Sequence, residues 1–437
     1  MSDLLLAYYG DDLTGSTDVM EALASRGVPT VLFTQPPTAA QRAKFADARA
    51  IGLAGSSRSE TPAWMDDHLT PALEWLKSLG AAFCHYKVCS TFDSSPAIGS
   101  IGRAIDIGRA AFGQEVVPLI VGAPQLKRYT AFGHLFAAYQ GGVTRIDRHP
   151  VMSRHPVTPM READLAVHLA AQTNTPVALI GLDVLARNDV DAVVDAASGI
   201  VLLDVCDAAT QRAAGEQVRR LAESAGPFVA GSSGVEYALM AALGAGGRAS
   251  FAAVPGLPQI LVLSGSCSPT TERQIRHALG HGFAGIAADP LALAAAGSGE
   301  EARLVAAALA ALDSGQSPLI YTALGPDTDK GPQLDATPGA RQASGEALGR
   351  IARALIERAG LRRVILAGGD TSSHALGQLD ILALITRYPL AATPGSPLCI
   401  AHSGAAALNG IEIAMKGGQV GGDDYFAMLR DGISTNR

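Results

Sequence analysis

Along most of its length the chain alternates short apolar runs with amphipathic stretches of helical period, in the order strand, loop, helix. The runs that predict strands in the first half are Leu4–Tyr9, Thr30–Phe33, Ala50–Ala54, Ala81–Val88, Val116–Val121, Val177–Ile180, Ile200–Val205 and Phe228–Ala230. Helical patterns between them include Ser100–Phe112, Glu162–Gln172 and Ala208–Glu223. Continuous apolar strands that alternate with helices are typical of a largely parallel, doubly wound α/β sheet.

A second series of the same kind follows the helical pattern at Val235–Leu243. Its predicted strands are Gln259–Leu263, Pro318–Thr322, Val364–Ala367 and Ile411–Met415. The intervening segment "GAGGRASFAAVPGLP", residues 244–258, is rich in Gly, Ala and Pro, which predicts a linker. We therefore expect two α/β domains, residues 1–243 and 259–437, each with its own largely parallel sheet, and an active site in the cleft between them.

Composition narrows the functional classes. Of 437 residues, 48% are hydrophobic and 17% charged, which favours large buried cores over disorder. The net charge of -7 argues against a basic surface that would bind nucleic acid. No apolar run is long enough to span a membrane, and the N-terminus lacks the basic region of a signal peptide. Five scattered cysteines show no metal-ligand spacing and fit a reducing compartment. These features predict a cytoplasmic protein with no protein-ligated metal.

Two adjacent carboxylates, Asp11 and Asp12, follow the first predicted strand in "LLLAYYGDDLTGSTD". In open α/β sheets, ligands bind at the carboxyl ends of the strands, where this pair would lie. One Asp needs no explanation beyond capping the helix that begins near Gly15. Two in a row, followed by further polar residues, exceed what a cap requires, so both are candidate catalytic residues.

Other polar loops of the first half carry candidate ligands for a small substrate. "CHYKVCSTFDSSP" sets a lysine beside hydroxyls at a strand end, which suits a carboxylated, hydroxylated ligand, although a capped helix with a snorkelling lysine is the alternative. Two histidines lie in "YTAFGHLF" and in a Pro-punctuated loop, where a lone histidine is often only a surface residue. The candidate substrate-binding residues are Lys87, Ser90, Thr91, Asp93, His134 and His155.

Three strand-end loops of the second half resemble one another: "LVLSGSCSPTTERQI", "VILAGGDTSSHAL" and "IAMKGGQVGGDDYF". Glycines permit close backbone approach, and N–H groups at a helix start bind anions. Ordinary tight turns also favour Gly, Ser and Asp, but three such loops with a lysine favour a polyphosphate, here without any P-loop motif. The candidate nucleotide-binding residues are Ser264, Gly265, Ser266, Gly368, Gly369, Asp370, Thr371, Lys416, Gly417, Gly418 and Gly421.

Taken in order, "GDDLTGSTD", "HPVTPMREADL", "LVLSGSCSPTTERQI", "AGGDTS" and "MKGGQVGG" resemble the four-carbon acid sugar kinase family, and the match runs from the first strand nearly to the C-terminus. The resemblance implies a sugar-acid-binding first domain and an ATP-binding second domain. It also implies ATP contacts at Ser264–Ser266, Gly368–Thr371 and Gly418.

One stretch departs from the family pattern. Where the family commonly has "KIDSTLRGN", this chain has "KVCSTFDSSP", so that Cys89 stands for an aspartate and Asp93 for an arginine. An arginine lost from a carboxylate-binding loop should alter substrate choice. The "CSTFDSSP" form resembles the branch that phosphorylates 3-oxo-isoapionate.

The sequence thus predicts an enzyme that transfers the γ-phosphoryl group of ATP to a primary hydroxyl of a small sugar acid. The expected acid is 3-oxo-isoapionate or a four-carbon acid such as 3-oxo-tetronate, threonate or erythronate. Asp12 is the expected base, Asp11 assists it, and Mg²⁺ accompanies ATP. The assembly is left open, with a homodimer as one option. The alternatives are a nicotinamide-dependent dehydrogenase, which the missing GxGxxG motif disfavours, and a non-catalytic sugar-acid sensor.

Overall fold

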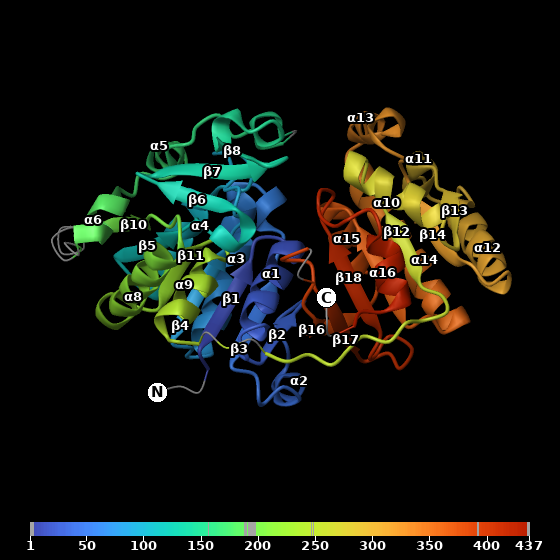
Figure 1. Cartoon of the computed structure of the whole chain (residues 1–437), viewed down its shortest axis with the longest axis horizontal. Helices are drawn as coiled ribbons and strands as arrows, with labels where there is room; N and C mark the ends of the chain where they lie inside the picture. Colours follow the sequence, from blue (N-terminus) through green and yellow to red (C-terminus); the bar gives the residue numbers. More distant parts are fainter. Residues whose placement is uncertain are drawn as a thin grey trace. The chain divides into compact units, whose positions relative to one another are not determined.

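The computed structural model describes residues 4–155, 157–187, 190, 198–245, 247, 249–390 and 393–434, excluding the side chain of Asp370. The chain divides into two compact units, Met1–Ala249 and Ser250–Arg437. Each unit is an α/β structure around a mostly parallel sheet (Figure 1). The predicted fold class, two α/β domains on largely parallel sheets, is therefore confirmed.

The sheet of the first unit is parallel throughout and has the strand order β2-β3-β1-β4-β11-β5-β10-β9. Its strands are β1 (Leu6–Gly10), β2 (Thr30–Phe33), β3 (Ala50–Ala54), β4 (Phe83–Lys87), β5 (Val116–Ile120), β9 (Val177–Ile180), β10 (Gly199–Leu203) and β11 (Phe228–Gly231). All eight strands predicted for this half of the chain are found. The carboxyl ends of β3, β1 and β4 are neighbours, which brings their following loops together.

The helices of the first unit cover both faces of this sheet. They are α1 (Leu13–Ala24), α2 (Ala39–Ala43), α3 (Pro62–Ser78), α4 (Ile101–Phe112), α5 (Leu165–Ala170), α6 (Leu182–Arg187), α8 (Ala208–Ser224) and α9 (Gly234–Ala242). Helix α3 packs on α4, while α9 packs on α1 and α8. Crossovers between parallel strands are right-handed. The connections through α3 and α4 run along the sheet in one direction and those through α1 and α8 run in the other, so the two groups of helices lie on opposite faces.

A small antiparallel sheet interrupts the alternation after β5, and the sequence analysis did not predict it. It consists of β6 (Arg128–Ala131), β7 (His134–Tyr139) and β8 (Gly142–Arg145), in that order. Its strands are four to six residues long and joined by glycine turns, so no sustained period-2 pattern marks them. Short one-turn helices flank this sheet: η2 (Pro124–Leu126), η3 (Ile146–Arg148) and η4 (Met152–Arg154).

The sheet of the second unit has the order β13-β14-β12-β15-β18-β17-β16. Its strands are β12 (Leu261–Ser264), β13 (Phe283–Ala287), β14 (Ser317–Tyr321), β15 (Arg363–Ala367), β16 (Ile381–Tyr388), β17 (Leu398–Ser403) and β18 (Glu412–Lys416). The first five strands in this order are parallel, whereas β17 is antiparallel to both of its neighbours. The four strands predicted for this half are found as β12, β14, β15 and β18, while β13, β16 and β17 were missed.

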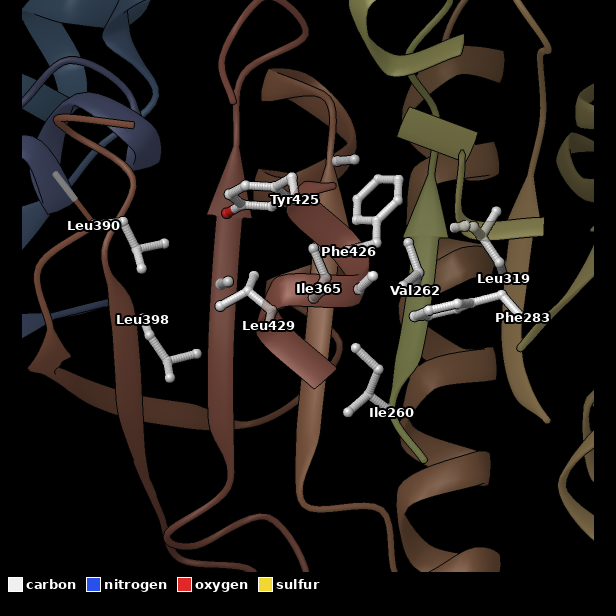
Figure 2. Packing of buried hydrophobic residues seen from close by; sticks show 14 of the residues in the cluster. Ile260, Val262, Phe283, Leu319, Ile365, Leu390, Leu398, Tyr425, Phe426 and Leu429 are labelled. Atoms are coloured by element: carbon white, nitrogen blue, oxygen red, sulfur yellow. The ribbon is translucent and has the colours of Figure 1, made fainter. Parts of the chain in front are cut away.

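Helices also pack in two groups in the second unit, α12 with α14 and α10 with α16. Its helices are α10 (Pro269–Leu279), α11 (Pro290–Ala294), α12 (Glu300–Asp313), α13 (Gly331–Asp335), α14 (Ala340–Ala359), α15 (Gly369–Leu376) and α16 (Tyr425–Asp431), with the one-turn helix η5 (Pro326–Thr328). Figure 2 shows Phe426 and Leu429 of α16 over Val262 of β12 and Ile365 of β15, inside one buried cluster.

The segment predicted as a linker, residues 244–258, contributes to this core. Val254 is buried in the cluster, Leu257 packs against it, and Val254 forms an antiparallel bridge with Ile433. The C-terminal part of that segment therefore belongs structurally to the second unit.

Candidate active site

The carboxylate pair lies where the sequence predicted it, directly after β1. Asp12 is the N-cap of α1, and its side chain accepts a hydrogen bond from the backbone N–H of Gly15. A methyl group built on Gly15 would lie 2.6 Å from Asp12 Oδ1 and 2.7 Å from Lys87 Nζ. A side chain at this position would force both charged groups to shift, so glycine leaves them in place beside the first turn of α1.

Arg58, in the one-turn helix η1 (Ser57–Ser59) after β3, was missed by the sequence analysis. Its Nη1 donates to Asp12 Oδ2 over 2.7 Å, and its Nη2 lies 3.0 Å from both oxygens of Asp93. Its backbone N–H donates to the carbonyl oxygen of Asp11. One guanidinium thus joins the loops after β1 and β4, and charge-assisted bonds of this kind are among the strongest in proteins.

Asp93 is the anchor for that guanidinium. Its side chain is fully buried and accepts hydrogen bonds from the hydroxyls of Thr91 and Thr158. Thr158 also contacts Nδ1 of His155 at 3.1 Å, which brings this predicted residue to the cluster. Burial acts to raise the pKa of Asp93, but Arg58 and the bond from Thr91 outweigh it and hold that pKa below its usual value.

The two adjacent carboxylates differ in their surroundings. Asp12 is a quarter exposed, and Arg58 and Lys87 outweigh burial and lower its pKa. Asp11 is buried, its Oδ1 has no hydrogen-bond partner among the described residues, and burial and then the charge of Asp12 raise its pKa to about 7. Asp12 is therefore ionised at neutral pH, whereas Asp11 retains affinity for a proton.

Lys87 ends β4 inside the same cluster and is almost completely buried. Its Nζ lies 3.8 Å from Oδ2 of the buried Asp18, and the charge of Asp18 outweighs burial and raises the pKa of the lysine. Ser90 is half-buried in the loop that follows, two residues before the left-handed Phe92, with φ of 56°. This turn connects Lys87, at the end of β4, to Asp93.

His134 has different neighbours from the other predicted substrate residues. It begins β7, and its Nδ1 lies 2.8 Å from the carbonyl oxygen of Phe132. The N–H of the preceding residue, Gly133, donates to the buried Asp204, whose pKa is raised by burial. The described contacts do not join His134 to Asp12 or Asp93, and its role as a substrate ligand stays a prediction.

In the second unit, the three glycine-containing loops follow β12, β15 and β18, which are adjacent parallel strands. Their carboxyl ends meet at one edge of the sheet. A methyl group on Gly265 would lie 2.0 Å from Thr371 Oγ1, so glycine is required where the first loop contacts the second. Gly369 and Gly417, in contrast, have open space around the position of a side chain.

Thr271, in the first turn of α10, connects the loops after β12 and β18, and it too was missed by the sequence analysis. Its hydroxyl lies 3.0 Å from Ser266 Oγ, 3.2 Å from the carbonyl oxygen of Gly418 and 3.0 Å from Lys416 Nζ. Lys416 is fully buried, and burial lowers its pKa to about 7. The arrangement gathers hydroxyls and a potential cation beneath the loops, which suits an anionic ligand.

The remaining predicted nucleotide residues lie around this centre. Ser264 is buried at the end of β12. Gly421 lies in a turn whose carbonyl oxygens, those of Val420 and Gly422, accept hydrogen bonds from Gln274. The side chain of Asp370 lies outside the described structure.

Within the described part of the chain, no group of three or more His, Cys, Asp or Glu side chains could hold a metal ion. None of the described helices combines the length and the hydrophobicity that a bilayer span requires.

Comparison with known proteins decides the family. A model of a sugar-binding N-terminal domain matches residues 6–239, and a model of a nucleotide-binding C-terminal domain matches residues 261–426. A protein of Paraburkholderia graminis named 3-oxo-isoapionate kinase is 46% identical, over 98% of this chain and 94% of that protein. The chain belongs to the four-carbon acid sugar kinase family.

This sugar-acid kinase has further relatives of known sequence and structure. A 3-oxo-tetronate kinase of Pseudomonas fluorescens is 32% identical, over 97% of this chain and 96% of that protein. A solved structure of a Haemophilus influenzae protein superposes with a TM-score of 0.71 at 25% identity, covering 97% of this chain and all of that one. One of a Salmonella typhimurium protein gives 0.76 at 26% identity, covering 97% and 98%. The family assignment rejects the dehydrogenase and the non-catalytic sensor.

Proposed function

We propose that this kinase uses ATP to phosphorylate a primary hydroxyl of a small sugar acid, with 3-oxo-isoapionate as the first candidate. The relative named 3-oxo-isoapionate kinase is 46% identical, against 32% for the 3-oxo-tetronate kinase of Pseudomonas fluorescens. This difference supports 3-oxo-isoapionate over the four-carbon acids 3-oxo-tetronate, threonate and erythronate.

The observation that carries the ATP assignment is the meeting of three loops: Thr271 joins the loops after β12 and β18, and Gly265 packs against Thr371 of the loop after β15. Helix α15 begins at one of these loops without a side-chain cap, so its first N–H groups are available to phosphate oxygens; in α10, Pro269 has no N–H and Ser268 caps Thr271. The open space at Gly369 and Gly417 permits close approach of a ligand, and Lys416 can supply positive charge beneath it. These residues fit a polyphosphate and would hold the donor nucleotide, which supplies the phosphoryl group when bound.

In the first unit, Asp12 is the member of the carboxylate pair that can meet a substrate hydroxyl, because its side chain is partly exposed. Arg58 and the N–H of Gly15 fix its orientation and keep it ionised. A carboxylate of low pKa suffices for this reaction, since phosphoryl transfer depends chiefly on positioning and charge neutralisation. Asp12 therefore orients the hydroxyl and accepts its proton late in the transfer.

Asp11 and Lys87 are more deeply buried than Asp12 and set the charge of the site. Lys87 offsets the negative charge of the carboxylates, and Asp11 adds to that charge only when it loses its proton. Mg²⁺ would be held mainly by the phosphates of the nucleotide, since this ion usually takes only one or two protein carboxylates.

A coupled ADP-release screen tests this proposal. The purified protein with ATP and Mg²⁺ is offered 3-oxo-isoapionate, 3-oxo-tetronate, threonate, erythronate and their neutral alcohols. We expect acid-dependent ADP release with the highest kcat/KM for 3-oxo-isoapionate. If no sugar acid stimulates ADP release, the proposal is wrong; if a four-carbon acid is preferred, only the choice of substrate is wrong.

A further inference from the structure

The cations at the acidic cluster are already engaged by protein carboxylates. Arg58 is paired with Asp12 and Asp93. Lys87 is almost fully buried and directed at Asp18. Because both cations already face protein carboxylates, the carboxylate of an anionic substrate requires a cation that is not already paired.

Arg128, the first residue of β6, is such a cation. It forms no ion pair with any carboxylate of the described chain, and its Nε is buried there without a hydrogen-bond partner. Its Nη1 donates only to carbonyl oxygens, those of Leu126 and Lys127, at 3.0 and 3.2 Å. A buried guanidinium donor with no acceptor is costly, which is expected where a ligand completes the site.

The fold brings this side chain towards the acidic cluster. The acidic cluster lies at the carboxyl ends of β1, β3 and β4, and only β11 separates β4 from β5 in the sheet. The backbone of Arg128 is fixed by an antiparallel bridge to Ala123, just beyond the carboxyl end of β5. Arg128 therefore approaches the loop after β4 from a second strand end of the same sheet.

We propose that Arg128 binds the carboxylate of the sugar acid and so selects acids over neutral sugars. This inference rests on the proposed function, because it names the group that recognises the substrate of that same site. The planar guanidinium suits a carboxylate, with Nε and an Nη available for two parallel hydrogen bonds. The hydroxyl to be phosphorylated would then point from this anchor towards Asp12.

The test compares an acid with its own amide, which keeps every hydroxyl but carries no charge. In the wild type we expect a strong preference for the acid in kcat/KM. Arg128→Gln should lower kcat/KM for the acid by about 10- to 150-fold and leave that for the amide nearly unchanged. Arg128→Lys should recover part of the preference, because it keeps the charge and loses the planar geometry.

Lys127→Gln is the matched control, since it removes a neighbouring exposed charge and should leave the preference intact. The KM for ATP should not change in any of these variants. Equal losses for acid and amide in Arg128→Gln, or an unchanged preference, would overturn the assignment of Arg128. Calorimetric titration without nucleotide measures the affinities for the acid and the amide even if no phosphorylation occurs. A protein that binds the acid through Arg128 but does not phosphorylate it would contradict the proposed function and leave the assignment of Arg128 intact.

Discussion

Nη2 of Arg58 lies 3.0 Å from both carboxylate oxygens of Asp93, so the residue that departs from the family pattern serves as the counterion of an arginine from another loop. The sequence predicts that Asp93 alters substrate choice because it replaces an arginine that would bind the carboxylate of the substrate. The structure gives it a definite partner, and any effect on substrate choice would be exerted through Arg58 and the orientation of Asp12.

Arg58→Met should destabilise the protein, because it leaves the buried Asp93 without its counterion. We expect a loss of about 3 kcal/mol in the free energy of unfolding. Adding Asp93→Asn should recover much of this loss, and denaturant unfolding of the two single variants and the double variant measures the coupling. Purely additive losses would show that the pair does not act as a unit.

The same pair gives a pH dependence of stability. The pKa of Asp93 is lower in the folded protein than in the unfolded chain, so the pair stabilises above the unfolded value of about 3.9. This stability is lost as the pH falls through the folded-state pKa, and Arg58→Met should lose less on acidification than the wild type.

Asp12→Asn keeps the shape of the side chain and its ability to cap α1, but removes its charge. If Asp12 orients the hydroxyl and accepts its proton, kcat should fall by about 10²- to 10⁴-fold with little change in the KM for ATP. Thermal melting of the same protein separates this from a structural effect. A stable variant that turns over within a few-fold of the wild type would exclude Asp12 as the base.

Asp11 should make sugar-acid binding sensitive to pH. Its pKa is about 7, so it is neutral below that pH and adds a negative charge above it. We expect the KM for the anionic acid to rise between about pH 6 and about pH 8, because the extra charge repels the substrate. Asp11→Asn should flatten this dependence and should raise Tm more at the higher pH, where the native carboxylate is ionised.

A KM for the acid that changes equally in the wild type and in Asp11→Asn would assign the pH dependence to another group. The KM for the neutral amide of the same acid is the internal control, since Asp11 should not affect it.

Thr271→Val tests whether the loops after β12 and β18 act together at the nucleotide. The isosteric change leaves Lys416 and Ser266 without their shared partner, so the KM for ATP should rise by about tenfold. Thr271→Ser restores the hydroxyl and should restore the KM. A valine variant with wild-type ATP kinetics, or a serine variant as impaired as the valine one, would contradict this role.

The positions of Asp12 and Lys87 could be predicted because Asp12 lies just after β1 and Lys87 ends β4, and ligands bind at the carboxyl ends of parallel strands. Arg58 could not, because its importance depends on β3 lying beside β1. "GSSRSE" by itself has the pattern of an ordinary polar turn. The same holds for Thr271, whose partner Lys416 lies 145 residues further along the chain.

Arg128 was missed for a related reason. The small sheet β6–β8 has no pattern long enough to predict, so a strand-borne arginine there resembles any loop arginine. The missed strands β16 and β17 are antiparallel at one end of a mostly parallel sheet, where the alternation of strand and helix fails as a guide. Local patterns thus predicted the sheets, whereas the charge pairing within the site required the strand order.

The most direct test of the account is the identity of the phosphorylated product. The protein is incubated with 3-oxo-isoapionate, Mg²⁺ and ATP labelled with ¹⁸O in the γ-phosphoryl group, and the products are analysed by mass spectrometry and ³¹P NMR. The account predicts equal amounts of ADP and of a phosphomonoester of the acid, in which the labelled phosphoryl group is attached to the primary hydroxyl. An unmodified acid in the presence of active, folded protein, or labelled inorganic phosphate in place of the ester, would contradict it.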